Sequence, residues 1–285
     1  MTRSRDRIVG CLVGGAIGDV LGGVPERGRL SLSDDTQLTL ATCEAIESSG
    51  GVRPQVVADT FLRWYQEGSF SGLGSSTTKA LRDLSAGAHW ALAGARGEMA
   101  AGNGAAMRIA PLAFVLDPFD TEYRTLIRDV CRITHHSDEA YIGALAVLLA
   151  ICLPTWPPGN VYFSDLVTAL PDSRVRDRLV CFAELPVETP LSKVVGQFGS
   201  SGYVVETVPL ALFIAARVTS ASFASALAEL AECGDDADTI GSIAGQVAFS
   251  HLGAPAIPES LASLAPVRDV VPLAERFARI TLGAT

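Results

Sequence analysis

The sequence has little positive charge and lacks the cysteine patterns of secreted or zinc-binding proteins. Among 285 residues, 31 are acidic and 22 are lysine or arginine, which gives a formal net charge of −9. Nucleic-acid backbones are bound by basic surfaces, so this charge argues against such a partner. The six cysteines are scattered and include no CxxC pair. We therefore predict free, mostly buried thiols in a reducing compartment rather than a disulfide framework or a zinc site.

Long apolar runs are also missing. The longest, residues 140–153, has fourteen residues, whereas a membrane-spanning helix needs roughly 20. It is better explained as a buried core helix. No apolar segment of the signal-peptide type follows the arginines at positions 3, 5 and 7, because residues 10–23 are rich in glycine and contain Asp19. We expect a cytoplasmic protein without a membrane partner.

Alternating runs of β-branched residues, which indicate strands, are nearly absent. Helical periodicity dominates, and it predicts helices at residues 8–21, 36–48, 54–66, 76–84, 121–134, 138–153, 204–217, 220–233 and 239–252. The proline-rich segment 154–202 is expected to be a loop-rich insertion with short helical pieces. No shift in composition divides the chain. We therefore predict a single all-α domain over residues 1–285.

Two acidic clusters about two hundred residues apart are the most informative feature of the sequence. Residues 33–36 read Ser-Asp-Asp-Thr and residues 236–239 read Asp-Ala-Asp-Thr, and each precedes an apolar helical run. Acids at a helix start are also explained by capping and by the helix dipole, but a cap uses one oxygen. Asp235, Asp236 and Asp238 would repel one another unless water or a cation screens them. Because oxygen donors suit hard divalent cations, we predict that the clusters together form one metal site.

The glycines of residues 10–23 indicate close packing of a helix or close approach of a ligand, since glycine inside a helix costs about 0.5–1 kcal/mol relative to alanine. Glu26 follows Pro25 in a predicted loop. It is either a solvated acid or a carboxylate turned to the metal site.

Three further segments have the residue types of a binding site. Residues 102–108, Gly-Asn-Gly-Ala-Ala-Met-Arg, would let a phosphate or sugar approach the backbone, with Arg108 adding charge; a turn that opens a helix explains them equally well. His135 has no further ligand at zinc spacing, which favours a polar lining or capping role. Tyr203 follows a flexible turn and either stacks on a base or ribose or belongs to a loop.

Six motifs, in this order, resemble those of the ADP-ribosylglycohydrolases, the family of the dinitrogenase reductase activating glycohydrolase. They are GGAIGDVLG from residue 14 with Glu26, SDDT at 33–36, GNGAAMR at 102–108, TH at 134–135, GYVVET at 202–207 and DADTIG at 236–241. The resemblance covers nearly the whole chain. It implies a compact multi-helix domain of the ADP-ribosylglycohydrolase type.

The resemblance also implies a site with two magnesium ions, or manganese in their place. Its metal ligands would be Ser33, Asp34, Asp35, Asp236, Asp238 and Thr239. Its substrate-binding residues would be Gly102, Asn103, Gly104, Met107, Arg108, His135 and Tyr203. Bound metals hold ribose hydroxyls and lower the pKa of a water. Two carboxylates would act as catalytic proton acceptors or donors, Glu26 and Asp35.

The activity that the resemblance implies is magnesium-dependent removal of ADP-ribose from a modified protein side chain or a small ADP-ribose conjugate. Gly72 stands where arginine-specific relatives carry aspartate, so the linkage to the acceptor stays open. An ADP-ribose-binding module or a toxin-immunity protein with little or no turnover is the alternative. A purely structural protein would not need the complete set of oxygen donors.

Overall fold

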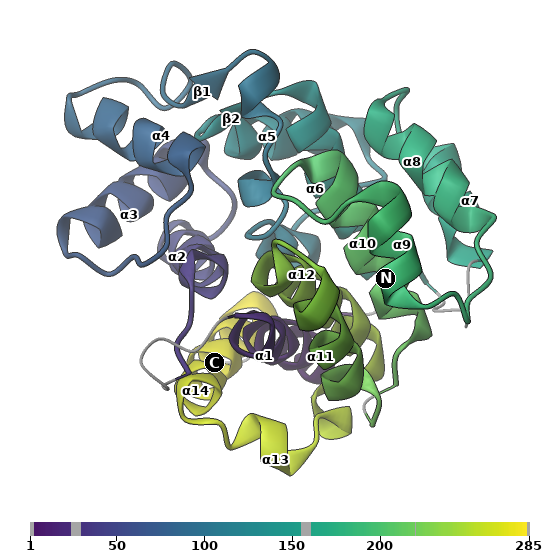
Figure 1. The fold of residues 1–285 in the computed structure, drawn as a ribbon. Coiled ribbons are helices and arrows are strands. Elements are labelled where there is room, and N and C mark those ends of the chain that lie inside the picture. The colour runs from purple at the N-terminus through teal and green to yellow at the C-terminus, as the bar shows by residue number, and fades with distance from the viewer. Residues whose placement is uncertain (1–2, 24–29, 155–160, 220, 284–285) are drawn as a thin grey trace.

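The computed structural model describes residues 3–23, 30–154, 161–219 and 221–283, and these residues are mainly helical (Figure 1). The α-helices are α1 Arg5–Gly22, α2 Asp34–Ser49, α3 Pro54–Gln66, α4 Ser75–Ser85, α5 Thr121–Arg132, α6 Asp138–Cys152, α7 Val161–Ala169, α8 Arg174–Ala183, α9 Leu191–Phe198, α10 Val204–Arg217, α11 Phe223–Cys233, α12 Ala237–Leu252, α13 Glu259–Ala262 and α14 Ala265–Thr281. Short 3-10 turns include η2, Asn103–Ala105.

Strands are limited to two residues each in the described ranges. β1 (Ala95–Arg96) pairs in parallel with β2 (His135–His136), with Ala95 opposite His135. The predicted all-α fold is therefore confirmed. The Ala95 N–H donates to the Thr134 carbonyl over 3.0 Å, which joins the two short strands.

The centre of the molecule is the close contact between α1 and α12, which lie side by side in Figure 1. A Cβ atom added at Gly18 would lie 1.9 Å from the carbonyl oxygen of Gly241, and one at Gly22 would lie 2.2 Å from that of Ala237. Only glycine allows the two backbones to approach this closely. Close helix packing therefore explains these glycines, and it brings the end of α1 beside the start of α12.

Helix α6 forms the other part of the core. Every residue from Ala140 to Cys152 is buried, which confirms residues 140–153 as a core helix. Within the described ranges, no helix is long and apolar enough to cross a membrane. The free thiols of Cys11, Cys43 and Cys131 are buried as predicted, whereas that of Cys181 is exposed.

All the predicted helices are present, with changes of a few residues at their ends. The 154–202 segment is more regular than its prolines indicate, because α7, α8 and α9 occupy much of it and bury Phe163 and Phe182 in the core. Residues 155–160 and 220 lie outside the described residues. Helix α14 is not predicted by the sequence pattern, which Pro266 and Pro272 interrupt. Pro266 lies in the first turn, where its missing N–H needs no partner.

Candidate active site

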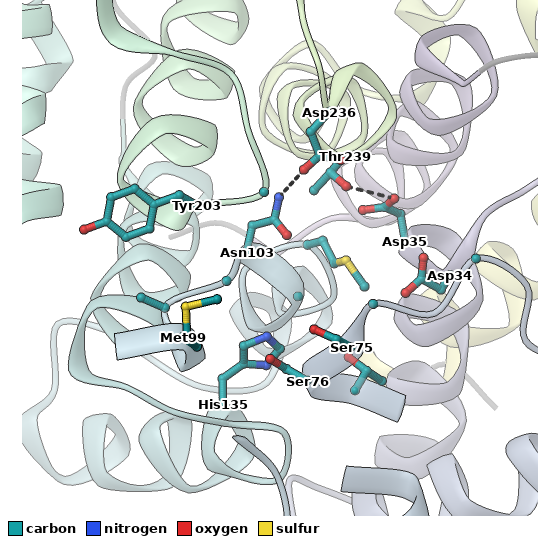
Figure 2. A pocket seen from close by; sticks show the side chains of 18 of the residues that line it. Asp34, Asp35, Ser75, Ser76, Met99, Asn103, His135, Tyr203, Asp236 and Thr239 are labelled. Carbon is teal, nitrogen blue, oxygen red and sulfur yellow. Dashed lines mark hydrogen bonds between the residues drawn. The ribbon is translucent and has the colours of Figure 1, made fainter. Parts of the chain in front are cut away.

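The starts of α2 and α12 meet, and each carries one of the two acidic clusters. Asp34 and Asp35 lie in the first turn of α2, and Asp238 lies in the first turn of α12. The Thr239 hydroxyl donates to Asp35 Oδ2 over 3.2 Å, which joins residues 204 positions apart. This contact is drawn in Figure 2. The α1–α12 contact thus brings together the two clusters that the sequence places near opposite ends of the chain.

The clusters face a cavity of about 580 Å³. Eleven of the predicted site residues line it: Asp34, Asp35, Asp236, Asp238, Thr239, Gly102, Asn103, Gly104, Met107, His135 and Tyr203. Figure 2 shows Asp34 and Tyr203 at opposite ends of this cavity, with Asn103 between them. The acids of α2 and α12 therefore share one space with the small residues of the 102–107 segment.

Asp35 is the most deeply buried acid of the site. Its side chain accepts from the Ser33 hydroxyl over 2.8 Å and from Thr239, both at Oδ2. Its other oxygen, Oδ1, is buried and has no hydrogen-bond partner among the residues that the structure describes. Burial, followed by the neighbouring carboxylates of Asp19, Asp34 and Asp238, raises the pKa of Asp35 well above its usual range. An unpaired buried carboxylate oxygen is costly unless a cation or proton compensates it.

The neighbouring acids are perturbed in the same direction. Burial raises the pKa of Asp34 to about 7, and nearby Asp19 and Asp238 add to this rise. Burial also raises the pKa of Asp236 to about 6, although the hydrogen bond from Asn103 opposes the shift. The common cause is a set of like charges gathered in a place with little water.

A divalent cation fits the chemistry of these donors. As the side chains lie, no group of three or more His, Cys, Asp or Glu in the described part of the chain is spaced to hold a metal ion. The fit rests instead on two observations, an oxygen-only donor set at one cavity and the unpaired Asp35 Oδ1. Hard cations such as Mg²⁺ take oxygen ligands, and a bound cation would compensate the unpaired Asp35 oxygen.

The wall opposite the acids is built from glycine backbone packed on an imidazole ring. A Cβ atom on Gly104 would lie 2.8 Å from His135 Cε1, so the backbone lies directly over the ring. His135 Nδ1 is 2.7 Å from the Thr134 hydroxyl. Burial, and then the charge of Arg108, lowers the pKa of His135 to about 3. His135 is therefore a neutral group in the cavity wall at physiological pH.

Asn103 connects this wall to the acids. Its amide nitrogen donates to Asp236 Oδ2 over 2.5 Å and to the Thr207 hydroxyl over 3.0 Å. Its backbone N–H donates to the Gly202 carbonyl over 3.0 Å, beside the bridge between Gly102 and Tyr203. Asn103 thus fixes both the first residue of the second cluster and the segment that carries Tyr203.

The family model for ADP-ribosylglycohydrolases matches residues 1–284. The chain belongs to the ADP-ribosylglycohydrolase family. The ADP-ribosylarginine hydrolase Tri1 of Pseudomonas putida (strain GB-1) is 28% identical over 281 residues, covering 90% of this chain and 72% of that protein. The ADP-ribosylhydrolase ARH3 of Bos taurus is 24% identical over 322 residues, covering 90% and 88%.

A solved structure described as an ADP-ribosylglycohydrolase-related protein complex has the same fold. It superposes with a TM-score of 0.69 at 28% identity and covers 99% of this chain and 100% of that chain. The family resemblance read from the six motifs is confirmed.

Two predicted site residues that the structure describes, Ser33 and Arg108, lie outside the cavity lining. Ser33 caps α2, because its hydroxyl accepts from the Asp35 N–H over 3.1 Å. It lines a smaller neighbouring cavity of about 160 Å³ with Asp19 and Asp238. Glu26 lies outside the described residues. Both Ser33 and Glu26 remain predictions as a metal ligand and a catalytic residue.

Arg108, predicted to bind substrate, is buried behind the cavity wall. Its guanidinium donates to the Gly104 carbonyl and to the Thr134 hydroxyl, the latter over 2.9 Å. It also lies over the Phe61 ring, 5.2 Å from the centroid. Arg108 is not among the residues that line the cavity. Its position instead supports the backbone that forms the wall, because arginine supplies several donors to buried carbonyls.

The cavity is also lined by residues that were not among the predicted metal, substrate-binding or catalytic residues. Ser75 and Ser76, at the start of α4, line it beside the acids, and Met99 forms an exposed part of the rim. Gly72 has φ +77°, and a Cβ atom added there would lie 3.7 Å from Asp34 Oδ1. Their sequence signal was weak, because serine at a helix start is common for capping alone.

Proposed function

We propose that this chain is a magnesium-dependent hydrolase that removes ADP-ribose from modified protein side chains, at arginine or another linkage, or from small ADP-ribose conjugates. Family membership supports removal of ADP-ribose, and the relative from Pseudomonas putida is named an ADP-ribosylarginine hydrolase. One observation carries the proposal: acids from α2 and α12 meet at one cavity, where Asp35 Oδ1 is buried and unpaired.

In this proposal, Asp34, Asp35, Asp236, Asp238 and Thr239 hold two Mg²⁺ ions, or Mn²⁺ in their place, with Ser33 as a further hydroxyl donor. When bound, the ions supply charge neutralisation and lower the pKa of a bound water at the ribose.

The remaining steps belong to the chain's own residues. Asn103 keeps Asp236 oriented toward the cavity through its 2.5 Å hydrogen bond. Gly102 and Gly104 have no side chains to exclude a ribose or diphosphate, and neutral His135 lines the cavity beneath them without adding charge. Tyr203, at the other end of the cavity, offers an aromatic ring to the nucleotide. Asp35, or Glu26, moves the proton between water and leaving group.

The residues beside Asp34 do not favour one linkage between ADP-ribose and its acceptor. Gly72 has no side chain beside Asp34, so it brings no carboxylate to an arginine guanidinium. Ser75 and Ser76 offer only hydroxyls there. The missing carboxylate is a reason to test several linkages for hydrolysis, and not the arginine linkage alone. It also favours a non-hydrolytic ADP-ribose-binding module as the second candidate function.

The test is release of ADP-ribose from arginine-, serine- and acyl-linked substrates, each with Mg²⁺ and with a chelator. We expect Mg²⁺-dependent release from at least one linkage. Tight binding of ADP-ribose with no release from any linkage would favour the binding module. Absence of both binding and release would refute the proposed function.

A further inference from the structure

The carboxylate of Asp19 caps helix α2 although it belongs to helix α1. It accepts from the Ser33 N–H over 3.1 Å and from the Thr36 N–H over 3.2 Å. The Thr36 hydroxyl donates to the same carboxylate over 2.5 Å. The first N–H groups of a helix have no partner within the helix, so this carboxylate satisfies donors that a local side chain normally takes.

This arrangement frees the acids that follow. The Asp35 N–H donates to the Ser33 hydroxyl. Asp34 and Asp35 line the cavity, and Asp35 Oδ1 has no hydrogen-bond partner among the described residues. A carboxylate in the first turn of a helix can accept from the free backbone N–H groups there. With the Thr36 N–H bonded to Asp19 and the Asp35 N–H bonded to Ser33, these donors do not draw the Asp35 carboxylate away from the cavity.

The packing of α1 against α12 also fixes the position of Asp19 relative to the second acidic cluster. Asp19 lies between Gly18 and Gly22, and both glycines contact the α12 backbone at Gly241 and Ala237. Asp19 also lines the smaller cavity together with Asp238. One side chain therefore links the start of α2 to the start of α12.

The charge of Asp19 is a second feature. An asparagine oxygen would accept the same backbone N–H groups without placing another negative charge beside Asp34, Asp35 and Asp238. A carboxylate in this place is unfavourable for the chain alone and favourable when cations are present. Outer groups of this kind orient metal ligands and strengthen metal binding.

We propose that Asp19 is a positioning residue of the cation site: it caps α2 so that Asp34 and Asp35 face the cavity, and its charge strengthens cation binding from behind them. This inference rests on the proposed function. It adds a residue that makes no contact with the main cavity, since Asp19 lines only the smaller one.

The test is calorimetric titration of the full chain with Mg²⁺, together with the melting temperature without cation. We expect Asp19→Asn to melt no lower than wild type without cation, because the amide oxygen still accepts from α2 and one buried charge is removed, while the Mg²⁺ dissociation constant rises about 10- to 100-fold. Asp120→Ala is the matched control, since Asp120 caps the remote helix α5 through the Glu122 N–H. We expect this control to melt about 2–4 °C lower and to bind Mg²⁺ normally.

A second variant keeps the proposal testable if Asp19→Asn does not fold. Thr36→Val removes only the hydroxyl that donates to Asp19, and we expect it to weaken Mg²⁺ binding several-fold. Normal Mg²⁺ affinity in whichever of the two variants folds, with the wild type binding Mg²⁺, would overturn the role of Asp19 alone. Failure of the wild type to bind Mg²⁺ would instead overturn the proposed cation site, and this inference with it.

Discussion

Replacing Gly18 with alanine should test the contact that assembles the site. The added Cβ atom would lie 1.9 Å from the Gly241 carbonyl oxygen, and Cβ contacts under 3.0 Å essentially do not occur. The α1 and α12 backbones must therefore separate by about 1 Å at this point. Both are rigid, buried helices, so no flexible side chain can absorb the shift.

The expected magnitude follows from two opposing effects. Alanine is favoured over glycine inside a helix by about 1 kcal/mol. Overpacking a buried contact costs about 1–3 kcal/mol and more when backbone must move. With an overpacking cost of about 3 kcal/mol and a helix gain of about 1 kcal/mol, we expect a net loss of about 2 kcal/mol, which corresponds to roughly 4–8 °C in melting temperature. Mg²⁺ binding should weaken as well. Asp19 of α1 holds the start of α2, so a shift of α1 away from α12 would move Asp35 away from Thr239.

Gly196→Ala is the matched control for this substitution. Gly196 lies in helix α9, and nothing lies within 4 Å of an added Cβ atom. We expect it to raise the free energy of unfolding by up to about 1 kcal/mol. Denaturant unfolding measures both variants. A Gly18→Ala protein as stable as wild type would refute the packing argument.

Two further predictions concern the cavity wall. Asn103→Ala should lower kcat/KM for ADP-ribose release by at least about tenfold, because the Asp236 carboxylate loses the hydrogen bond from the Asn103 amide. Gln55→Ala, which removes an exposed amide, is the control. Equal activity of the two variants would contradict the role of Asn103. His135 should stay neutral in NMR titrations from pH 8 to 5, since its pKa lies at about 3. The unfolded chain binds this proton below about pH 6.5, so His135 makes the free energy of unfolding fall as pH drops from about 6.5 toward 3. Titration of the assigned His135 imidazole signal near pH 6.5 would contradict this prediction.

The helices could be predicted because their apolar periodicity is strong and their starts carry caps. Helix α14 could not, since Pro272 interrupts the pattern while the surrounding contacts keep the helix intact. The 154–202 segment was underestimated for a similar reason. Pro171 follows the end of α7 and Pro190 caps the start of α9, so neither interrupts a helix, and apolar residues such as Phe163 and Phe182 reach the core.

The candidate site was predicted from motifs, and its assembly from helix packing became visible only in the structure. Residue types identified Asp34, Asp35 and Asp238, but not the glycine contact between α1 and α12, beside which the starts of α2 and α12 meet. The position of Arg108 could not be predicted either. A charged residue next to a glycine-rich loop suggests a ligand contact, whereas here its hydrogen bonds go to buried carbonyl and hydroxyl groups of the chain.

In the proposed function, the two acidic clusters form one cation site that is needed for release of ADP-ribose. Calorimetric titration with Mg²⁺ of Asp34→Ala and Asp238→Ala tests this site, with Asp177→Ala, on the exposed face of helix α8, as the control. We predict that each of the first two substitutions abolishes Mg²⁺ binding, and that the control binds as wild type does. Normal Mg²⁺ binding by either Asp34→Ala or Asp238→Ala would contradict a shared site.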